Sequence, residues 1–258
     1  MRDKSFKTGF APVVTIPENK EGTVILMTNI SENIKRVRGQ IEDSAARSGR
    51  TGEDIKLVAA AKMNGAENVR EAIACGVDAV GENRVQEMLE KVLQGAYVGA
   101  PLHFIGHLQT NKVKSVVGTC ELIESVGSVK LLGEIDRHAV AAGIKQDILI
   151  EVNVGSEPGK SGVLVEELDA LLCSCAEKSG IFVRGLMAIP PFLPEKGVNR
   201  TFFDMMRKLF VDIQGKKYDN VYMQYLSMGM SDSFCDAIEC GANMVRVGSA
   251  IFGARAVH

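Results

Sequence analysis

Lys62 follows directly on an apolar run and is the first candidate for chemistry. The five residues before it, Leu57 to Ala61, are all apolar. An ammonium group at the end of such a run is partly desolvated, which favours the neutral amine and makes it a nucleophile toward an aldehyde or ketone. The alternative is a surface lysine that ends a strand and reaches into water.

Arg246 is the second candidate, because it interrupts the otherwise apolar run from Met244 to Val247. A guanidinium stays charged and is costly to bury without a partner. If Arg246 points into the protein, it needs an acceptor. Either a heteroaromatic ring nitrogen or a carboxylate would serve.

Small residues end two neighbouring apolar runs near the end of the chain. Ser227 and Gly229 follow one run, and Gly248 and Ser249 follow the next. Backbone N–H groups and small hydroxyl side chains let a phosphate dianion approach closely. The alternative is that they are turn glycines and helix caps. We expect a phosphate cradle, because both loops carry the same residue types.

Two further polar residues follow earlier apolar runs. Asn83 lies in Gly81-Glu82-Asn83-Arg84, and His107 lies in the segment from Gly106 to Lys112. We expect both at the site, although Asn83 or Thr110 could equally cap the helix that follows. His103 and His107 do not lie along one helix face, and no carboxylate or cysteine completes a metal site, so we expect no metal.

The segment from Gly155 to Gly162 resembles a nucleotide-binding P-loop but departs from its spacing. Three residues, not four, separate Gly155 from Gly159-Lys160-Ser161. We therefore expect no nucleoside triphosphate site, while a loop that brings Lys160 over a bound ligand remains open.

Eight short apolar runs alternate with amphipathic stretches from residue 55 onward, and these must position the candidates. The runs are Ile55–Ala61, Ala79–Val80, Leu102–Ile105, Leu122–Val126, Ile148–Val154, Phe182–Ile189, Val221–Leu226 and Met244–Val247. The seven helical stretches between them include Ala66–Ala74, Arg84–Leu93, Val129–Ala142, Val165–Lys178, Thr201–Ile213 and Ser233–Cys240.

Apolar strands that alternate with helices indicate a parallel sheet covered by helices. Eight such units predict an α/β fold of the TIM barrel type, a single (β/α)8 barrel. An open doubly wound sheet is the alternative, but no GxGxxG follows the first strand. In a barrel the chemistry lies just after each strand, and the last two loops commonly hold a phosphate.

The N-terminal segment divides into a tail and an additional helix. Residues 1–26 have no apolar period and are expected to be a loose tail, and residues 27–258 form one domain. A capping residue at Asn29 or Ser31 starts a helix with apolar Ile34, Val37 and Ile41. We also hypothesise that translation begins at Met27.

Composition excludes several classes of protein. The 258 residues are 46% hydrophobic and 24% charged with a net charge of -2, so the chain has no basic surplus for nucleic acid. No run reaches the length of a membrane span, and Met1 to Lys20 lacks the apolar region of a signal peptide, so we expect a protein that is not secreted by this route. The six scattered cysteines fit a cytoplasmic protein with reduced thiols.

These candidates together describe a site for a phosphorylated aldehyde. Pyridoxal 5'-phosphate (PLP) meets each requirement, with its aldehyde on Lys62, its phosphate in the cradle and its ring nitrogen on Arg246.

The chain resembles the pyridoxal phosphate homeostasis proteins, also called the proline synthetase co-transcribed family, from about residue 29 to 255. The segments that carry the likeness are Leu57–Lys62, Gly81–Asn83, His103–Lys112, Gly185–Met187, Leu226–Ser231 and Met244–Gly253. The resemblance implies a barrel of the alanine racemase N-terminal type that holds PLP as a Schiff base on Lys62. It also implies a role in PLP buffering and delivery without a dedicated reaction, with apo PLP-dependent enzymes as recipients. We expect a monomer.

Two positions depart from the family pattern. Asn64 stands where members often have a second lysine, which puts any hand-off role of that lysine in doubt. Gly127 stands where Asp is usual, and we expect the missing carboxylate to alter the mouth of the barrel without removing cofactor binding.

A PLP-dependent amino acid racemase is the alternative function. Related racemases use a second acid/base, a tyrosine from an added C-terminal domain. This chain ends at His258, directly after the expected barrel, and its four tyrosines show no motif for that role. An arginine at the ring nitrogen also leaves the ring unprotonated, a weak electron sink. A Schiff-base aldolase without cofactor would explain Lys62 but not Arg246. We therefore expect a carrier and no enzyme.

Overall fold

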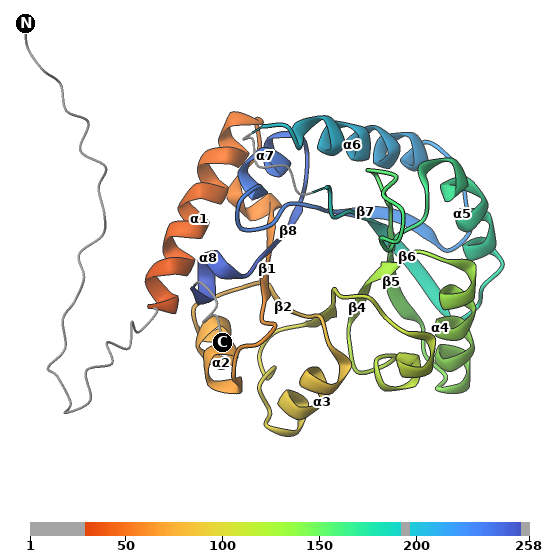
Figure 1. Ribbon diagram of the computed structural model, residues 1–258, viewed down its shortest axis with the longest axis horizontal. Coiled ribbons are helices and arrows are strands. Elements are labelled where there is room, and N and C mark those ends of the chain that lie inside the picture. Colours follow the sequence, from red (N-terminus) through yellow and green to blue (C-terminus); the bar gives the residue numbers. More distant parts are fainter. Residues whose placement is uncertain (1–28, 192–196, 254–258) are drawn as a thin grey trace, which may run out of the picture.

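Eight parallel strands close into a barrel in the order in which they occur along the chain (Figure 1). The computed structural model describes residues 29–191 and 197–253. The strands are β1 (Lys56–Ala60), β2 (Ala79–Glu82), β3 (Leu102–Phe104), β4 (Leu122–Val126), β5 (Gln146–Glu151), β6 (Ile181–Met187), β7 (Val221–Ser227) and β8 (Met244–Val247). Because β1 pairs with β8, the predicted barrel is confirmed and the open sheet is excluded.

Helices surround the ring of strands. They are α1 (Ile30–Arg47), α2 (Ala66–Ala74), α3 (Val85–Leu93), α4 (Val129–Ala141), α5 (Leu168–Ala176), α6 (Arg200–Gln214), α7 (Phe234–Glu239) and α8 (Ser249–Phe252), with short 3-10 segments η1 (Gly52–Asp54), η2 (Thr110–Ser115) and η3 (Val165–Glu167). The six helices named from the sequence are all present, with ends within three residues of the prediction.

The connection from β3 to β4 differs from the other βα units. It contains the 3-10 segment η2 instead of an α-helix, and only Val113 within that segment is buried. The segment from Gln109 to Gly118 contains Thr, Asn, Ser and three Val residues, all of which have low helix propensity. Two tight 3-10 turns therefore replace an α-helix in this connection to β4.

The predicted N-terminal helix is confirmed as α1, and Asn29 caps it. The Asn29 side chain accepts a hydrogen bond of 3.0 Å from the Glu32 N–H. The predicted stripe of Ile34, Val37 and Ile41 is buried, and Asn33 donates to the Ile251 carbonyl in α8. Thus α1 lies beside the end of the domain (Figure 1). The predicted tail over residues 1–26 and the hypothesis on Met27 fall outside the described residues.

The barrel interior has a small apolar core of its own. It contains Val58, Ala79, Leu122, Leu149, Met187 and Met244, one residue from each of six strands. Because alternate residues of a strand share a face, Arg246 lies on the same side of β8 as Met244. Val58 and Arg246 are also direct partners across the β1–β8 ladder.

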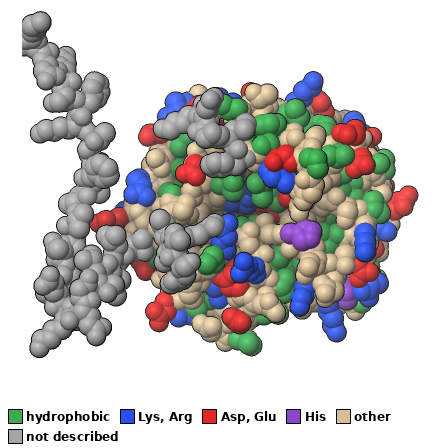
Figure 2. Space-filling model, in the orientation of Figure 1, with side chains coloured by type: hydrophobic (Ala, Val, Ile, Leu, Met, Phe, Trp, Pro, Cys, Tyr) green, Lys and Arg blue, Asp and Glu red, His purple; other side chains and the backbone are tan. Residues whose placement is uncertain are grey.

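The charged side chains on one face and the lengths of the described helices bear on possible partners. On the face that Figure 2 shows, basic and acidic side chains are interspersed. No helix within residues 29–191 and 197–253 is long and apolar enough to cross a bilayer.

Candidate functional site

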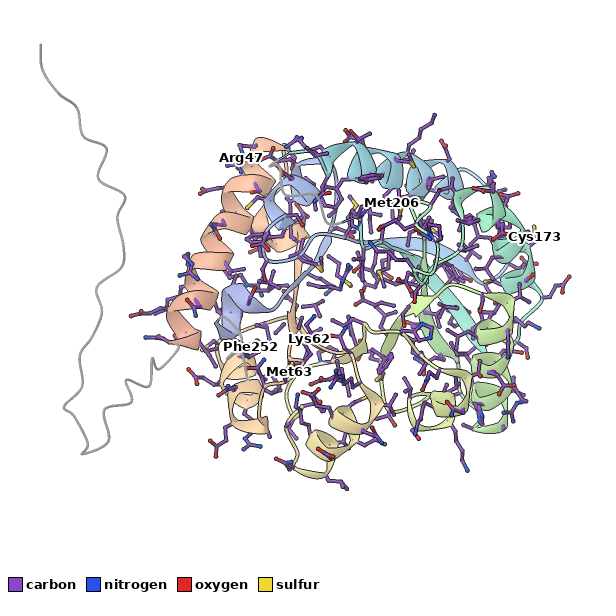
Figure 3. All side chains as sticks on the ribbon, in the orientation of Figure 1. Arg47, Lys62, Met63, Cys173, Met206 and Phe252 are labelled. Atoms are coloured by element: carbon purple, nitrogen blue, oxygen red, sulfur yellow. The ribbon has the colours of Figure 1, made fainter. Side chains whose placement is uncertain are left out.

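Lys62 lies at the carboxyl end of β1, in a β-turn. The Asn64 N–H donates to the Ala61 carbonyl over 3.1 Å and closes the turn, and the Ala61 N–H donates to the Gly81 carbonyl of β2 over 2.9 Å. Lys62 is half-buried, whereas Met63 next to it is 65% exposed. Figure 3 labels both residues at the end of β1. The lysine thus lies at the mouth, where barrels place their chemistry.

Arg246 points into the barrel, where it contacts residues of β4 and β7 and the residue that follows β6. Its Nη1 donates to Ser227 Oγ over 2.5 Å, and its Nη2 donates to the Ala188 carbonyl over 2.9 Å. Ser227 Oγ in turn donates to Glu124 Oε2 over 2.6 Å. Arg246 is 3% exposed, and Ser227 and Glu124 are fully buried. The expectation that a buried Arg246 needs an acceptor is met by the protein itself.

Glu124 and His103 are members of this buried network that the sequence analysis missed. His103 Nδ1 lies 2.8 Å from Glu124 Oε1, and both side chains are buried. Glu124 interrupts the apolar run from Leu122 to Val126 just as Arg246 interrupts its own run. That interruption was the signal that could have revealed it.

Burial and charge set the ionisation of the three charged groups inside the barrel. Burial opposes ionisation of Glu124, but the hydrogen bond from His103 and the charge of Arg246 outweigh it, so the pKa of Glu124 lies below its ordinary value. Burial lowers the pKa of Arg246. Glu151, at the end of β5, is 6% exposed, and burial raises its pKa to about 7 even though Arg246 acts against this.

The loops after β7 and β8 lie side by side, as the predicted phosphate cradle requires. The Arg246 N–H donates to the Gly229 carbonyl over 3.1 Å. The N–H groups of Gly248 and Ala250 converge on Ser231 Oγ at 3.2 and 3.3 Å. Ser231 was not among the predicted site residues, although it belongs to the same sequence motif as Ser227. Two amide donors aimed at one oxygen atom are the geometry that an anionic oxygen needs.

The four residues predicted for the cradle differ in their surroundings. Ser249 is exposed at the start of α8, and Gly248 precedes it. Ser227 lies deeper, and its hydroxyl is engaged with Glu124 and Arg246. Gly229 has a φ of 93°, and a Cβ there would lie 2.6 Å from the Ala237 Cβ. Glycine at 229 is therefore required by the backbone and by α7 packing.

Asn83 lies at the mouth beside the Lys62 turn. Its Oδ1 is buried and has no hydrogen-bond partner among the described residues. Asn83 does not cap α3, because Arg84 is the N-cap residue and no side chain caps this helix. Thr110 does not cap η2 either, since Gln109 holds that position. A buried acceptor without a donor is costly unless a ligand supplies one.

His107 belongs to the other half of the mouth. Its Nδ1 lies 2.9 Å from Ser161 Oγ, and the residue is exposed. It lines a cavity of about 550 Å³ together with Ser125, Glu151 and Lys160. Lys160, which the P-loop-like segment carries, forms an ion pair with Glu157. The structure thus groups His107 with β4 and β5 and places the other candidates around β1, β2, β7 and β8.

Gly127, one of the two departures from the family pattern, packs against the loop after β5. A Cβ at Gly127 would lie 2.6 Å from the Gly162 Cα. Any side chain here would displace that loop, so the missing carboxylate accompanies a close approach of two backbone segments.

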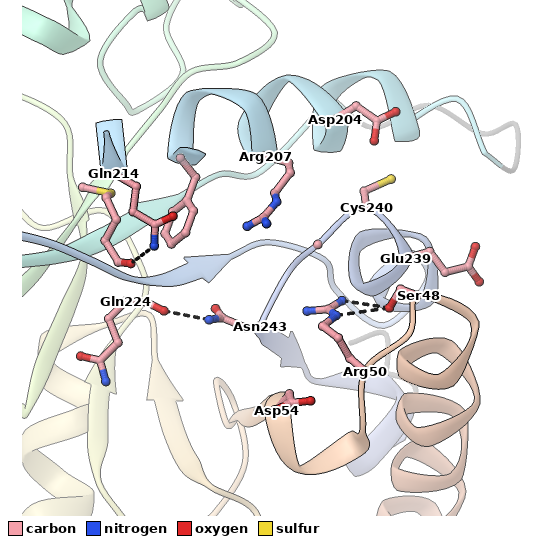
Figure 4. A pocket seen from close by; sticks show the side chains of 13 residues that line it. Ser48, Arg50, Asp54, Asp204, Arg207, Gln214, Gln224, Glu239, Cys240 and Asn243 are labelled. Atoms are coloured by element: carbon pink, nitrogen blue, oxygen red, sulfur yellow. Dashed lines mark hydrogen bonds between the residues drawn. The ribbon is translucent and has the colours of Figure 1, made fainter. Parts of the chain in front are cut away.

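A larger cavity, about 670 Å³, opens at the opposite, amino end of the strands (Figure 4). Arg50 and Asn243 in this cavity form hydrogen bonds that join neighbouring segments of the chain. Arg50 donates to Ser48 Oγ and to the carbonyls of Ile238 and Ala242. Asn243 bridges β7 and β8 through Leu226 and Gln224. This end of a barrel contributes to stability, whereas ligands bind at the carboxyl end.

No cluster of three or more His, Cys, Asp or Glu side chains suited to a metal ion occurs in the part of the chain that the structure describes. All six cysteines are free thiols.

Comparison with known proteins places the chain in a family. The profile of the family "Alanine racemase, N-terminal domain" matches residues 26–256. A curated relative from Aquifex aeolicus, named pyridoxal phosphate homeostasis protein, is 43% identical over 88% of this chain and 99% of its own length. The solved structure of PipY from Synechococcus elongatus with PLP bound has a TM-score of 0.75 and 29% identity, and it covers 87% of this chain and all of that one.

A more distant structure shows the fold alone. Alanine racemase from Clostridium difficile has a TM-score of 0.64 and 17% identity, over 89% of this chain and 57% of that one. Together with the closed barrel and the site at its carboxyl end, these findings show that the chain belongs to the pyridoxal phosphate homeostasis protein family, built on the alanine racemase N-terminal barrel.

Proposed function

We propose that this protein binds PLP at the mouth of the barrel, between the ends of β1, β2, β7 and β8, and holds it in reserve for other proteins. The observation that carries the proposal is that three groups follow the carboxyl ends of the neighbouring strands β1, β2 and β8. They are the amine-bearing turn at Lys62, the unpartnered Asn83 Oδ1, and the Gly248 and Ala250 amides with the Ser231 hydroxyl that they hold. Arg246 lies beneath them with its guanidinium in the barrel interior. The PLP-bound structure of a relative supports the same cofactor.

Each residue has a chemical part in the proposed site. The ε-amine of Lys62 condenses with an aldehyde, and a molecule of water leaves as the Schiff base forms. The Ser231 hydroxyl, whose oxygen accepts from the N–H groups of Gly248 and Ala250, and the hydroxyl of Ser249 offer donors to a phosphate. Asn83 Oδ1 accepts a hydrogen bond from the ligand. Contacts of Ser227, Gly229 and His107 with the cofactor stay predictions.

We further propose that the protein has no dedicated catalytic reaction. When bound, PLP supplies a reactive aldehyde and an electron-accepting ring. A guanidinium carries N–H donors but no acceptor atom. If Arg246 faces the ring nitrogen, that nitrogen must therefore accept a hydrogen bond and carry no proton. An unprotonated ring withdraws electrons weakly, which disfavours racemisation. The names of the relatives as homeostasis proteins support this reading.

We also propose recipients, a cellular compartment and an oligomeric state for this protein. Apo PLP-dependent enzymes are the recipients we propose, and the free thiols fit a reducing cytoplasm. We propose that the protein acts as a monomer.

One experiment tests the function. The purified protein is titrated with PLP, its visible spectrum is recorded before and after borohydride reduction, and the modified peptide is mapped. We expect a pyridoxyl group on Lys62 and none in Lys62→Ala. A protein that stays colourless with PLP, or is modified elsewhere, contradicts the proposal. Racemisation is tested on the holo-protein with single-enantiomer amino acids in deuterated water. Rapid α-deuterium exchange together with racemisation would show that the protein is a racemase.

A further inference from the structure

The turn that carries Lys62 has a backbone conformation that its sequence does not favour. Lys62 and Met63 are the central residues of the turn, and Met63 has a φ of 64°. A positive φ at the third position is the mark of a type II turn, where glycine is usual. A methionine side chain makes this conformation unfavourable, so surrounding contacts must hold it.

Side chains from α3 supply those contacts on both sides of Lys62. The Met63 N–H donates to Glu87 Oε1, and Lys91 Nζ donates to the Ala61 carbonyl over 2.9 Å. The Asn64 side chain donates to the carbonyl of Lys62 itself over 3.1 Å. Thus three side chains hold the backbone groups immediately before, at and after Lys62.

The two α3 residues are themselves held in a buried ion-pair cluster. Lys91 Nζ lies 2.9 Å from Glu87 Oε1 and 2.7 Å from Glu82 Oε1 of β2. The Tyr97 hydroxyl donates to the same Glu82 oxygen over 3.0 Å. The side chains of Lys91 and Glu82 are 6% and 0% exposed. Glu87 and Lys91 therefore have little freedom to move, and their hydrogen bonds restrict the backbone of the turn in the same way.

If the Glu87–Lys91 ion pair only stabilised the core, its two side chains would not need to hydrogen-bond the backbone of the Lys62 turn. Glu87 accepts from the N–H of the exposed Met63, and Lys91 donates to the carbonyl of the buried Ala61. A lysine side chain has several rotatable bonds, so fixing its backbone limits where its amine can go.

From this geometry we infer that Glu87 and Lys91 are positioning residues that set the place of the Lys62 amine for cofactor attachment. The inference rests on the proposed function, and it adds two residues that need not touch the cofactor.

The test compares PLP binding by full-length variants at Glu87. Glu87→Ala removes the acceptor of the Met63 N–H, Glu87→Asp keeps the charge but shortens the reach, and Glu87→Gln keeps an acceptor oxygen in place. Glu90→Ala is the matched control, because Glu90 is an exposed carboxylate on the same helix. Each variant is measured for its dissociation constant with PLP, its rate constant of Schiff-base formation and its free energy of unfolding.

We expect Glu87→Ala and Glu87→Asp to bind PLP about tenfold more weakly and to react more slowly. Glu87→Gln should stay within about threefold of the wild type, and Glu90→Ala should match it. If Glu87→Ala does not fold, the comparison of Glu87→Asp with Glu87→Gln decides. A folded Ala or Asp variant with wild-type affinity and rate overturns this inference alone. A wild type without a pyridoxyl group on Lys62 overturns the proposed function and the inference with it.

Discussion

Arg246 and Glu124 lie 3.8 Å apart, measured from Nη1 to Oε2, and the Ser227 hydroxyl joins them through two short hydrogen bonds. The pair spans the barrel interior from β8 to β4. It keeps the guanidinium charged and fixed beneath the proposed cofactor site. The protein thus provides the counter-charge for Arg246 itself.

The first prediction concerns Glu124. Replacement by Gln removes the negative charge between Arg246 and His103, and it leaves a buried guanidinium without a counter-ion. We expect the free energy of unfolding to fall by about 3–5 kcal/mol, as when one partner of a buried pair is removed. Urea unfolding measures this, with Glu121→Gln as the control because Glu121 is exposed just before the same strand. A loss below about 1 kcal/mol would show that the charge of Glu124 is not needed.

The second prediction concerns Arg246 itself. Arg246→Lys keeps a positive charge but loses the two-armed donor geometry that reaches Ser227 and Ala188. We expect the dissociation constant for PLP to rise about tenfold or more. Arg184→Lys is the control, since Arg184 pairs with Asp147 and lies over the Phe182 ring. Unchanged affinity in Arg246→Lys would place the guanidinium away from the ring.

The third prediction follows from the pKa of Glu151, which burial raises from 4.5 to about 7. In this pH range the folded protein keeps a proton on Glu151 that the unfolded chain releases. The contribution of Glu151 to the free energy of unfolding is therefore fully present below about pH 4.5 and is lost as the pH rises to about 7. The loss is at most about 3 kcal/mol.

Glu151→Gln removes this dependence. We expect the stability of the wild type relative to the variant to decline between pH 4.5 and 7 and to level off above, as measured by urea unfolding at several pH values. Glu166→Gln, at an exposed carboxylate, should run parallel to the wild type. A difference between the wild type and Glu151→Gln that does not vary with pH would contradict the prediction.

The fourth prediction separates stability from binding at Asn83. Its Oδ1 is buried without a partner in the protein, so Asn83→Ala removes an unsatisfied acceptor. We expect the free energy of unfolding of the apo-protein to change by less than about 1 kcal/mol, while PLP affinity falls about five- to thirtyfold. Thermal unfolding and PLP titration measure the two effects. A variant that loses stability but binds PLP normally would give Asn83 a purely structural role.

The sequence alone was enough to predict the barrel and two of its central charged residues. Alternation of apolar runs with amphipathic stretches is a local pattern, and it predicts the fold because each strand must be covered by a helix. Lys62 and Arg246 stood out because each breaks an apolar run. The period of two along β8 then indicates that Arg246 faces the interior, as Met244 does. The β3–β4 connection was the local exception, since weak helix propensity there gives η2.

Only the tertiary structure decided which residues meet. Glu124 reaches Arg246 because the closed barrel brings β4 and β8 to face one interior, and no local pattern contains that pairing. The amides of Gly248 and Ala250 meet Ser231 because the β7 and β8 loops lie side by side. The contacts of Glu87 and Lys91 with the Lys62 turn depend on how α3 packs over β1 and β2. Sequence periodicity determines which face a side chain takes, but barrel closure and packing determine its partner.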